Sequence, residues 1–149
     1  MDSLTLLRRL RLFLLATAGF IFLATPLELL LIEHFESPQQ FIPFLLCALG
    51  LATVALAVFR PRRSTLLAVR WVMAVIIAGS ALGVYLHIAN NLAFELEIRP
   101  GAAAGTVLID ALGGASPLLA PGILALAGAL AIAATYGRSE LDSFATRSS

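Results

Sequence analysis

The sequence contains no lysine, one cysteine and few charged residues of any kind. Of its 149 residues, 60% are hydrophobic and 13% are charged, whereas soluble domains have about 25% charged residues. This composition excludes an ordinary water-soluble fold. The absence of lysine and of interleaved aromatic and basic residues also argues against nucleic acid as a partner.

Sequence motifs of catalysis are missing as well. The single cysteine, Cys47, lies inside an apolar run and cannot form an intrachain disulfide, a CxxC redox pair or a thiolate metal knuckle. The sequence has no GxSxG nucleophile motif, no phosphate-binding loop and no HExxH zinc motif. We therefore assign no catalytic residue and favour a non-enzymatic protein.

The chain does contain four long apolar runs, at about residues 12–32, 41–59, 66–88 and 118–136. Each can cross about 30 Å of hydrocarbon as a helix. The first run is longer than the roughly 7–15 apolar residues of a signal peptide, so we expect it to be retained. The sequence thus predicts an all-α membrane protein, a single four-transmembrane-helix bundle over residues 1–149 with an outer loop at residues 89–117.

The arginines predict the orientation of this bundle. They cluster before the first run, between the second and third runs, and after the fourth, whereas the other two connections contain only Arg99. By the positive-inside rule, both termini are cytoplasmic and the segments 33–40 and 89–117 face outward. The clustered residues are Arg8, Arg9, Arg11, Arg60, Arg62, Arg63, Arg138 and Arg147, and Arg70 lies just beyond the second cluster.

Small residues recur at helical spacing in three of the runs. Gly79 and Gly83 form a GxxxG pair, which allows a second helix to approach closely. The same spacing of four continues to His87 and Asn91. We expect these two glycines to pack within the bundle, with self-association as the alternative. Alanines share one face in the second run and one in the fourth, and favour compact packing there: Ala48, Ala52 and Ala55, and Ala125, Ala129 and Ala133.

A polar cluster is predicted at the outer side of the membrane, around both histidines. Its other members are Glu28, Glu33, Glu36, Gln39, Gln40, Asn90, Asn91, Glu95 and Glu97. His34 and His87, with Glu28 and Glu33, form a ligand set suited to a divalent metal, and the two imidazoles alone could hold a haem. The spacing is not specific, because Glu33 and His34 are neighbours that point apart on a helix. Structural capping and hydrogen bonding at helix ends is the competing interpretation.

Glu28 adds a third hypothesis, which is transport or proton coupling. It lies four residues from the predicted outer end of the first run, about 6 Å deep at 1.5 Å per residue. A carboxylate at that depth must reach the interface, find a partner or hold a proton. Pro26, two residues earlier, removes a backbone hydrogen bond there.

The outer connection is open to more than one conformation. Residues 92–99 alternate between apolar and polar, which is typical of a strand, but Glu95 and Arg99 also suit a helical i, i+4 pair. Residues 103–112 could form a short interfacial helix with Asp110 facing water. Residues 113–122, rich in glycine and proline, could fold as an irregular cap over the bundle.

Three segments carry a resemblance to known proteins: residues 26–34 (PLELLLIEH), residues 83–97 with GVYLH and FELE, and residues 113–122 (GGASPLLAPG). In these segments the chain resembles small bacterial inner-membrane proteins that cross the membrane four times and have no assigned activity. The resemblance implies a bacterial cytoplasmic membrane and no particular chemistry. The first functional hypothesis is therefore an accessory or complex subunit, whose partner is another membrane protein or a second copy of the chain.

Overall fold

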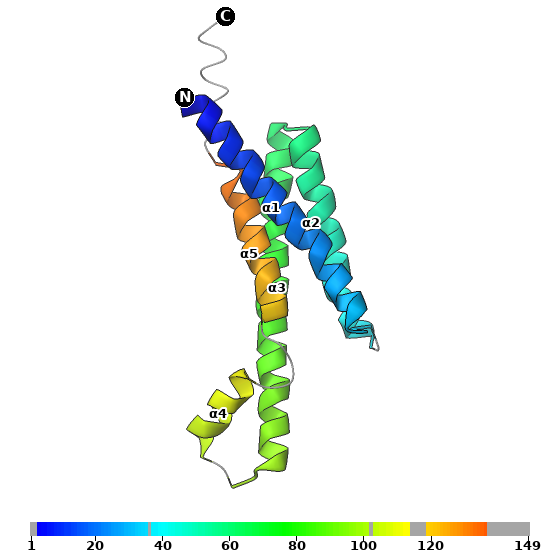
Figure 1. The fold of residues 1–149 in the computed structure, drawn as a ribbon, viewed down its shortest axis with the longest axis vertical. Coiled ribbons are helices and arrows are strands. Elements are labelled where there is room, and N and C mark those ends of the chain that lie inside the picture. Colours follow the sequence, from blue (N-terminus) through cyan, green and yellow to red (C-terminus); the bar gives the residue numbers. More distant parts are fainter. Residues whose placement is uncertain (1–2, 36, 102, 114–118, 137–149) are drawn as a thin grey trace, which may run out of the picture.

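The computed structural model describes residues 3–35, 37–101, 103–113 and 119–136, and all regular structure within them is helical. Three helices are long and apolar enough to cross a membrane: α1, α3 and the continuous segment Pro38–Phe59. The predicted all-helical membrane class is therefore confirmed. In chain order the elements are α1 (Ser3–Leu31), the short 3-10 helix η1 (Pro38–Phe41), α2 (Ile42–Phe59), α3 (Arg63–Ile98), α4 (Ala104–Leu112) and α5 (Leu119–Ala133) (Figure 1).

Helices α1, α2, α3 and α5 pack in a ring, in which each helix packs mainly against two neighbours. α1 and α3 lie opposite each other, and each packs against both α2 and α5, while α2 and α5 touch only slightly. The start of α1 and the α2–α3 turn lie at one end of the ring, which we call the arginine end (Figure 1). The α1–α2 turn lies at the opposite end, which we call the histidine end.

One apolar core joins the four helices, and it extends from Cys47 and Leu124 near the histidine end to Ala57 and Ala134 near the arginine end. The ring of Phe22 packs directly on Gly50, where an added Cβ would lie 2.7 Å from two of its atoms. Gly128 brings α5 against α3, because its Cβ would lie 2.9 Å from Ile77 Cγ1 and 3.3 Å from the Met73 carbonyl oxygen. Among the described glycines, these two leave the least room for an added Cβ.

The prediction that the alanine faces of the second and fourth runs pack within the bundle is wrong. Ala48 and Ala52 of α2, and Ala129 and Ala133 of α5, are exposed, while other faces of both helices are buried. In a chain that is apolar on every side, residue size alone does not indicate which face turns inward. The buried residues are instead Cys47, Gly50, Thr53, Val54 and Ala57 of α2, and Leu124, Ala127, Gly128 and Ala131 of α5.

The third helix is longer than the predicted run, because residues 89–98 continue it. With 36 residues, α3 is about 54 Å long, which exceeds the hydrocarbon thickness of about 30 Å. It ends where Pro100 follows Arg99, since the residue before a proline is disfavoured in a helix. The last turns of α3 therefore project beyond the other long helices, and α4 folds back beside them (Figure 1).

A candidate ligand cavity at the histidine end

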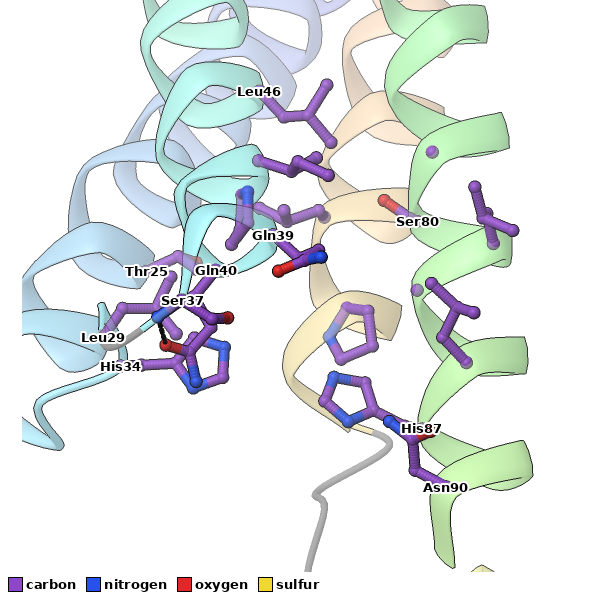
Figure 2. Close-up of a pocket in the computed structure, with 18 residues that line it drawn as sticks. Thr25, Leu29, His34, Ser37, Gln39, Gln40, Leu46, Ser80, His87 and Asn90 are labelled. Carbon is purple, nitrogen blue, oxygen red and sulfur yellow. Dashed lines mark hydrogen bonds between the residues drawn. The ribbon is translucent and has the colours of Figure 1, made fainter. Parts of the chain in front are cut away.

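A cavity of about 570 Å³ lies at the histidine end, between the α1–α2 hairpin on one side and α3 and α5 on the other. Figure 2 shows that its deep part faces Leu46 and Ser80, and that its polar side chains collect toward the mouth. Such a volume is typical of small-molecule sites. The residues that line it are Thr25, Leu29, His34, Ser37, Gln39, Gln40, Ile42, Pro43, Leu46, Gly79, Ser80, Leu82, Gly83, Leu86, His87, Asn90, Pro121 and Leu124.

His34 reaches the cavity because of the way α1 ends. Glu33 has a φ of 55°, the left-handed conformation that usually belongs to glycine after a helix. The His34 N–H donates to the Leu29 carbonyl at 2.9 Å, and the Glu33 N–H donates to the Leu30 carbonyl at 3.2 Å. This pair of bonds is a Schellman motif, and it turns the chain so that His34 lies at the cavity mouth.

The following segment supplies two amides to the cavity wall. The backbone N–H of Ser37 donates to Gln40 Oε1 at 2.8 Å, which fixes the start of η1 (Figure 2). Pro38 occupies the first turn of η1, where its missing N–H costs nothing. Gln39 and Gln40 therefore project from a defined turn toward the same space as His34.

α3 forms the opposite wall with one face, which runs from Gly79 through Gly83 to His87. A Cβ on Gly79 would lie 3.2 Å from Leu46 of α2, and one on Gly83 would lie 3.1 Å from Pro121 of α5. Both glycines of the predicted GxxxG pair thus contact other helices of the same chain. The groove between these contacts is the cavity.

Two hydroxyl groups lie on the deep wall of the cavity. The Ser80 hydroxyl donates to the Ile76 carbonyl at 2.8 Å, and the Thr25 hydroxyl donates to the Ile21 carbonyl at 2.9 Å. Each hydroxyl proton is thus used within its own helix, as is common for buried serine and threonine. The deep wall therefore offers acceptor oxygens and apolar carbon, without a free hydroxyl donor.

The structure brings together two of the four residues predicted as metal ligands. His34 and His87 line the same cavity, and Figure 2 shows both imidazoles at its mouth. Glu28 and Glu33 are exposed and do not line it. The described part of the chain contains no group of three or more His, Cys, Asp or Glu residues placed to hold a metal ion.

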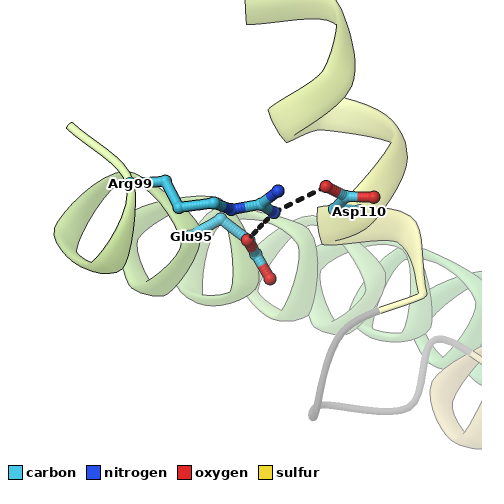
Figure 3. Close-up of polar contacts among 3 residues, drawn as sticks. All are labelled: Glu95, Arg99 and Asp110. Carbon is cyan, nitrogen blue, oxygen red and sulfur yellow. Dashed lines mark hydrogen bonds and ion pairs between the residues drawn. The ribbon is translucent and has the colours of Figure 1, made fainter. Parts of the chain in front are cut away.

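A second feature of this end is the hairpin formed by the last turns of α3 and α4. The amide of Asn91, which is buried, donates to the Ala111 carbonyl at 2.9 Å. Arg99 pairs with both Glu95 and Asp110 (Figure 3). Hydrogen bonds to Glu95 and then Asp110 raise the pKa of Arg99, so the guanidinium stays charged at any physiological pH.

Helix α4 places Val107 and Ala111 against α3 and leaves the opposite side bare. Leu108, Ile109 and Leu112 are all exposed, with Ile109 at 70%. Asp110, which the sequence predicted to face water, is partly exposed and is held by Arg99 of α3. α4 is therefore apolar on both sides, and one of those sides has no cover within the described chain.

The arginine end contains a polar link of its own. Arg70 Nε donates to Thr135 Oγ1 at 2.9 Å, and the guanidinium lies 4.9 Å from the ring centre of Tyr136. This link joins the end of α5 to the beginning of α3. Together with the contacts of Gly128 and Gly83, it shows that α5 runs antiparallel along α3 from Gly83 to Arg70.

Both histidines, Gln39, Gln40 and Asn90 belong to the predicted outer polar cluster, and all of them line the cavity. The deeper wall was not predicted, because Ser80 and the apolar residues around it have no sequence signal of their own. The spacing of four from Gly79 through Gly83 to His87 did indicate the correct face of α3. Its predicted continuation is Asn91, but Asn91 bonds to α4, and Asn90 lines the cavity instead.

No protein-family model matches the chain, and neither a curated protein nor a solved structure is detectably similar to it. The cavity and the α3–α4 hairpin are therefore the features from which a function can be inferred.

Proposed function

We propose that the protein crosses a bacterial cytoplasmic membrane four times, with α5 as the fourth span and both termini in the cytoplasm. The position of α5 supports the fourth span, because it lies along α3 from Gly83 to Arg70 and so shares the same membrane slab. The orientation is supported by Arg60, Arg62 and Arg63 in the α2–α3 turn. On this topology the histidine end and the α3–α4 hairpin face outward.

Within this topology, the protein acts as a non-enzymatic accessory subunit that binds a membrane protein partner through the hairpin. The observation that carries this proposal is the bare apolar side of α4, formed by Leu108, Ile109 and Leu112. α3 is about 54 Å long, so the hairpin extends past the hydrocarbon. Apolar side chains clustered outside the lipid are typical of a protein–protein contact.

Cysteine labelling tests the topology. In a Cys47→Ala background, single cysteines at Gln39, Ser64 and Ser149 are treated in intact cells with a reagent that does not cross the membrane. The proposal expects labelling at position 39 alone, with positions 64 and 149 labelled only after permeabilisation. Labelling of position 149 in intact cells would place the C-terminus outside the cell, which fits three spans and contradicts four.

Photo-crosslinking tests the partner. A photoreactive amino acid replaces Ile109 on the bare side of α4, and a matched variant carries it at Leu23, which is exposed on α1 at 53%. The proposal expects a discrete protein adduct from position 109 and only lipid adducts from position 23. The mass of the adduct distinguishes a second copy of this chain from a different protein, and no adduct at position 109 contradicts the proposal.

A second candidate function is metal or haem binding, which the shared position of His34 and His87 favours. Elemental analysis and absorbance spectra of the purified protein test it, before and after reconstitution with divalent metal and with haem. One equivalent of metal or haem that is lost in both the His34→Ala and the His87→Ala variant would support this function. Absence of metal and of a Soret band in every sample would remove it.

The transport hypothesis gains no such support. Glu28 is exposed on α1 and is not among the residues that line the cavity. Its test is flux into proteoliposomes, where equal activity of the Glu28→Gln variant excludes a role for this carboxylate.

A further inference from the structure

We propose that the cavity at the histidine end binds one amphiphile, which has a single alkyl chain and an acidic head group, either a carboxylate or a phosphate. The chain lies in the deep part beside Leu46 and Leu124, and the head lies at the mouth between His34 and His87. This inference rests on the proposed topology, because four spans place the mouth at the level of the lipid head groups.

The distribution of side chains along the cavity sets the class of ligand. The deep wall is made by Leu46, Leu124 and two glycines, and its hydroxyls already donate to their own helices. The mouth is made by imidazoles and amides. A ligand with one apolar end and one polar end matches both parts, whereas a uniformly polar solute would lose its hydration at the deep wall without regaining hydrogen bonds.

The mouth also sets the charge of the head group. The eighteen described residues that line the cavity include no Asp, Glu, Lys or Arg. The mouth offers N–H donors for an anionic oxygen, from two imidazoles and from the amides of Gln39, Gln40 and Asn90. A protonated imidazole is a cation, which attracts an acidic head and repels an ammonium head.

The volume argues for one slender chain. A cavity of about 570 Å³ lies in the range of sites that hold one small molecule. A single alkyl chain fits without opening the bundle. A metal ion bound at the mouth would leave the deep part unfilled.

The apolar chain and the head contribute differently to binding. A chain that leaves the surrounding lipid gains little from burial, because lipid tails are as apolar as the leucines of the deep wall. The affinity must therefore come mainly from hydrogen bonds to the head group. This separation gives the experiment two independent arms.

The first arm measures occupancy of the deep part. Trp71 is the only tryptophan of the chain, so a Trp71→Phe background accepts one reporter at a time. Leu82→Trp places the reporter on the cavity wall, and Tyr85→Trp places it on the same helix outside the cavity. Protein in dodecyl maltoside is titrated with a dibrominated octadecanoic acid, which quenches tryptophan fluorescence on contact.

The proposal expects saturable quenching at position 82 with one equivalent bound, and weak quenching proportional to concentration at position 85. Octadecyl phosphate and octadecanoic acid should compete, which shows whether phosphate or carboxylate binds better. Octadecanol and octadecylammonium should compete at least about tenfold less well, as expected for loss of one charge-assisted hydrogen bond. Equal quenching at the two positions overturns the proposal.

The second arm removes the head-group donors. In the Leu82→Trp background, the double variant His34→Leu, His87→Leu should lose at least about tenfold in affinity for the acid and none for octadecanol. Leu31→Ala, an exposed change outside the cavity, should alter neither. Two results overturn the proposal. One is an unchanged affinity for the acid in a double variant that elutes as a single species in size-exclusion chromatography, and the other is one bound metal ion per chain that the double variant loses.

The cysteine labelling tests the topology separately. Saturable binding of the acid in a protein whose labelling does not fit four spans would retain the ligand site and reject the topology.

Discussion

In the middle of the bundle and toward the arginine end, small residues and large side chains fill the space between the helices. At the histidine end, α1, α2, α3 and α5 line a cavity, and the α3–α4 hairpin beside it is held by polar contacts. Phe22 on Gly50 represents the packed core, and Asn91 on Ala111 represents the hairpin. The difference indicates that substitutions in the core affect the stability of the whole bundle, whereas substitutions in the hairpin act locally.

The largest expected effect lies in the apolar core. Phe22→Ala removes a ring that is 1% exposed and should lower the free energy of unfolding by about 2–3 kcal/mol. This is below the usual 3–5 kcal/mol for soluble cores, because the unfolded chain also stays in lipid. Phe20→Ala, at a residue that is 69% exposed, is the matched control and should have little effect in the same denaturation in mixed micelles.

Gly128→Ala should have the next largest effect, a loss of about 1–2 kcal/mol, because the new methyl group overlaps Ile77 and approaches the Met73 carbonyl. Gly122→Ala on the same helix meets nothing within 4 Å and should be neutral or slightly stabilising. Thermal unfolding followed by circular dichroism compares the two variants. Equal destabilisation by both variants would show that the close approach of α5 to α3 is not the reason for the cost of Gly128→Ala.

Asn91→Leu should cost about 1 kcal/mol, since it leaves the Ala111 carbonyl without its amide partner. The loss is confined to the hairpin. Hydrogen exchange should therefore accelerate in α4 and remain unchanged in α1 and α5. Asn90→Leu, the neighbouring change at an exposed residue, should leave α4 protected, and faster exchange throughout the molecule would contradict the separation of the two ends.

The smallest expected effect is a gain. Glu33→Gly should stabilise the protein by about 0.5–1 kcal/mol, because glycine adopts the positive φ of the α1–α2 turn without steric cost. Glu33→Ala removes the same charge without that relief and should not stabilise. If both variants change the free energy of unfolding equally, the effect comes from loss of the carboxylate and the positive φ at position 33 makes no contribution.

Much of the fold was predictable, because lipid imposes a strong length requirement on helices. The second run, residues 41–59, matches α2 to within one residue at its start. The first and third runs were found but underestimated, since α1 begins at Ser3 and α3 continues to Ile98. Hydropathy measures only the apolar stretch, whereas a helix continues through polar residues until a breaker such as Pro100.

The candidate site was only partly predictable. His34 and His87 could be placed at one level of the membrane from their positions in the apolar runs. Their convergence on one cavity depends on the Schellman turn at Glu33 and on the separation of the α1–α2 hairpin from α3. Neither has a signature in the sequence, because glutamate is an unusual residue for a positive φ.

The sequence by itself determined that the chain is an apolar helical protein, which segments are long enough to cross a bilayer, and where its arginines and histidines lie. These properties follow from composition and from the period of the helix, and they need no information on neighbouring helices. Only the tertiary structure decided which helix faces turn inward, that α4 folds back on α3, and that a cavity remains between the α1–α2 hairpin and helices α3 and α5. In a chain that is apolar on all sides, those outcomes depend on the fit between side chains, and that fit is a property of pairs of helices.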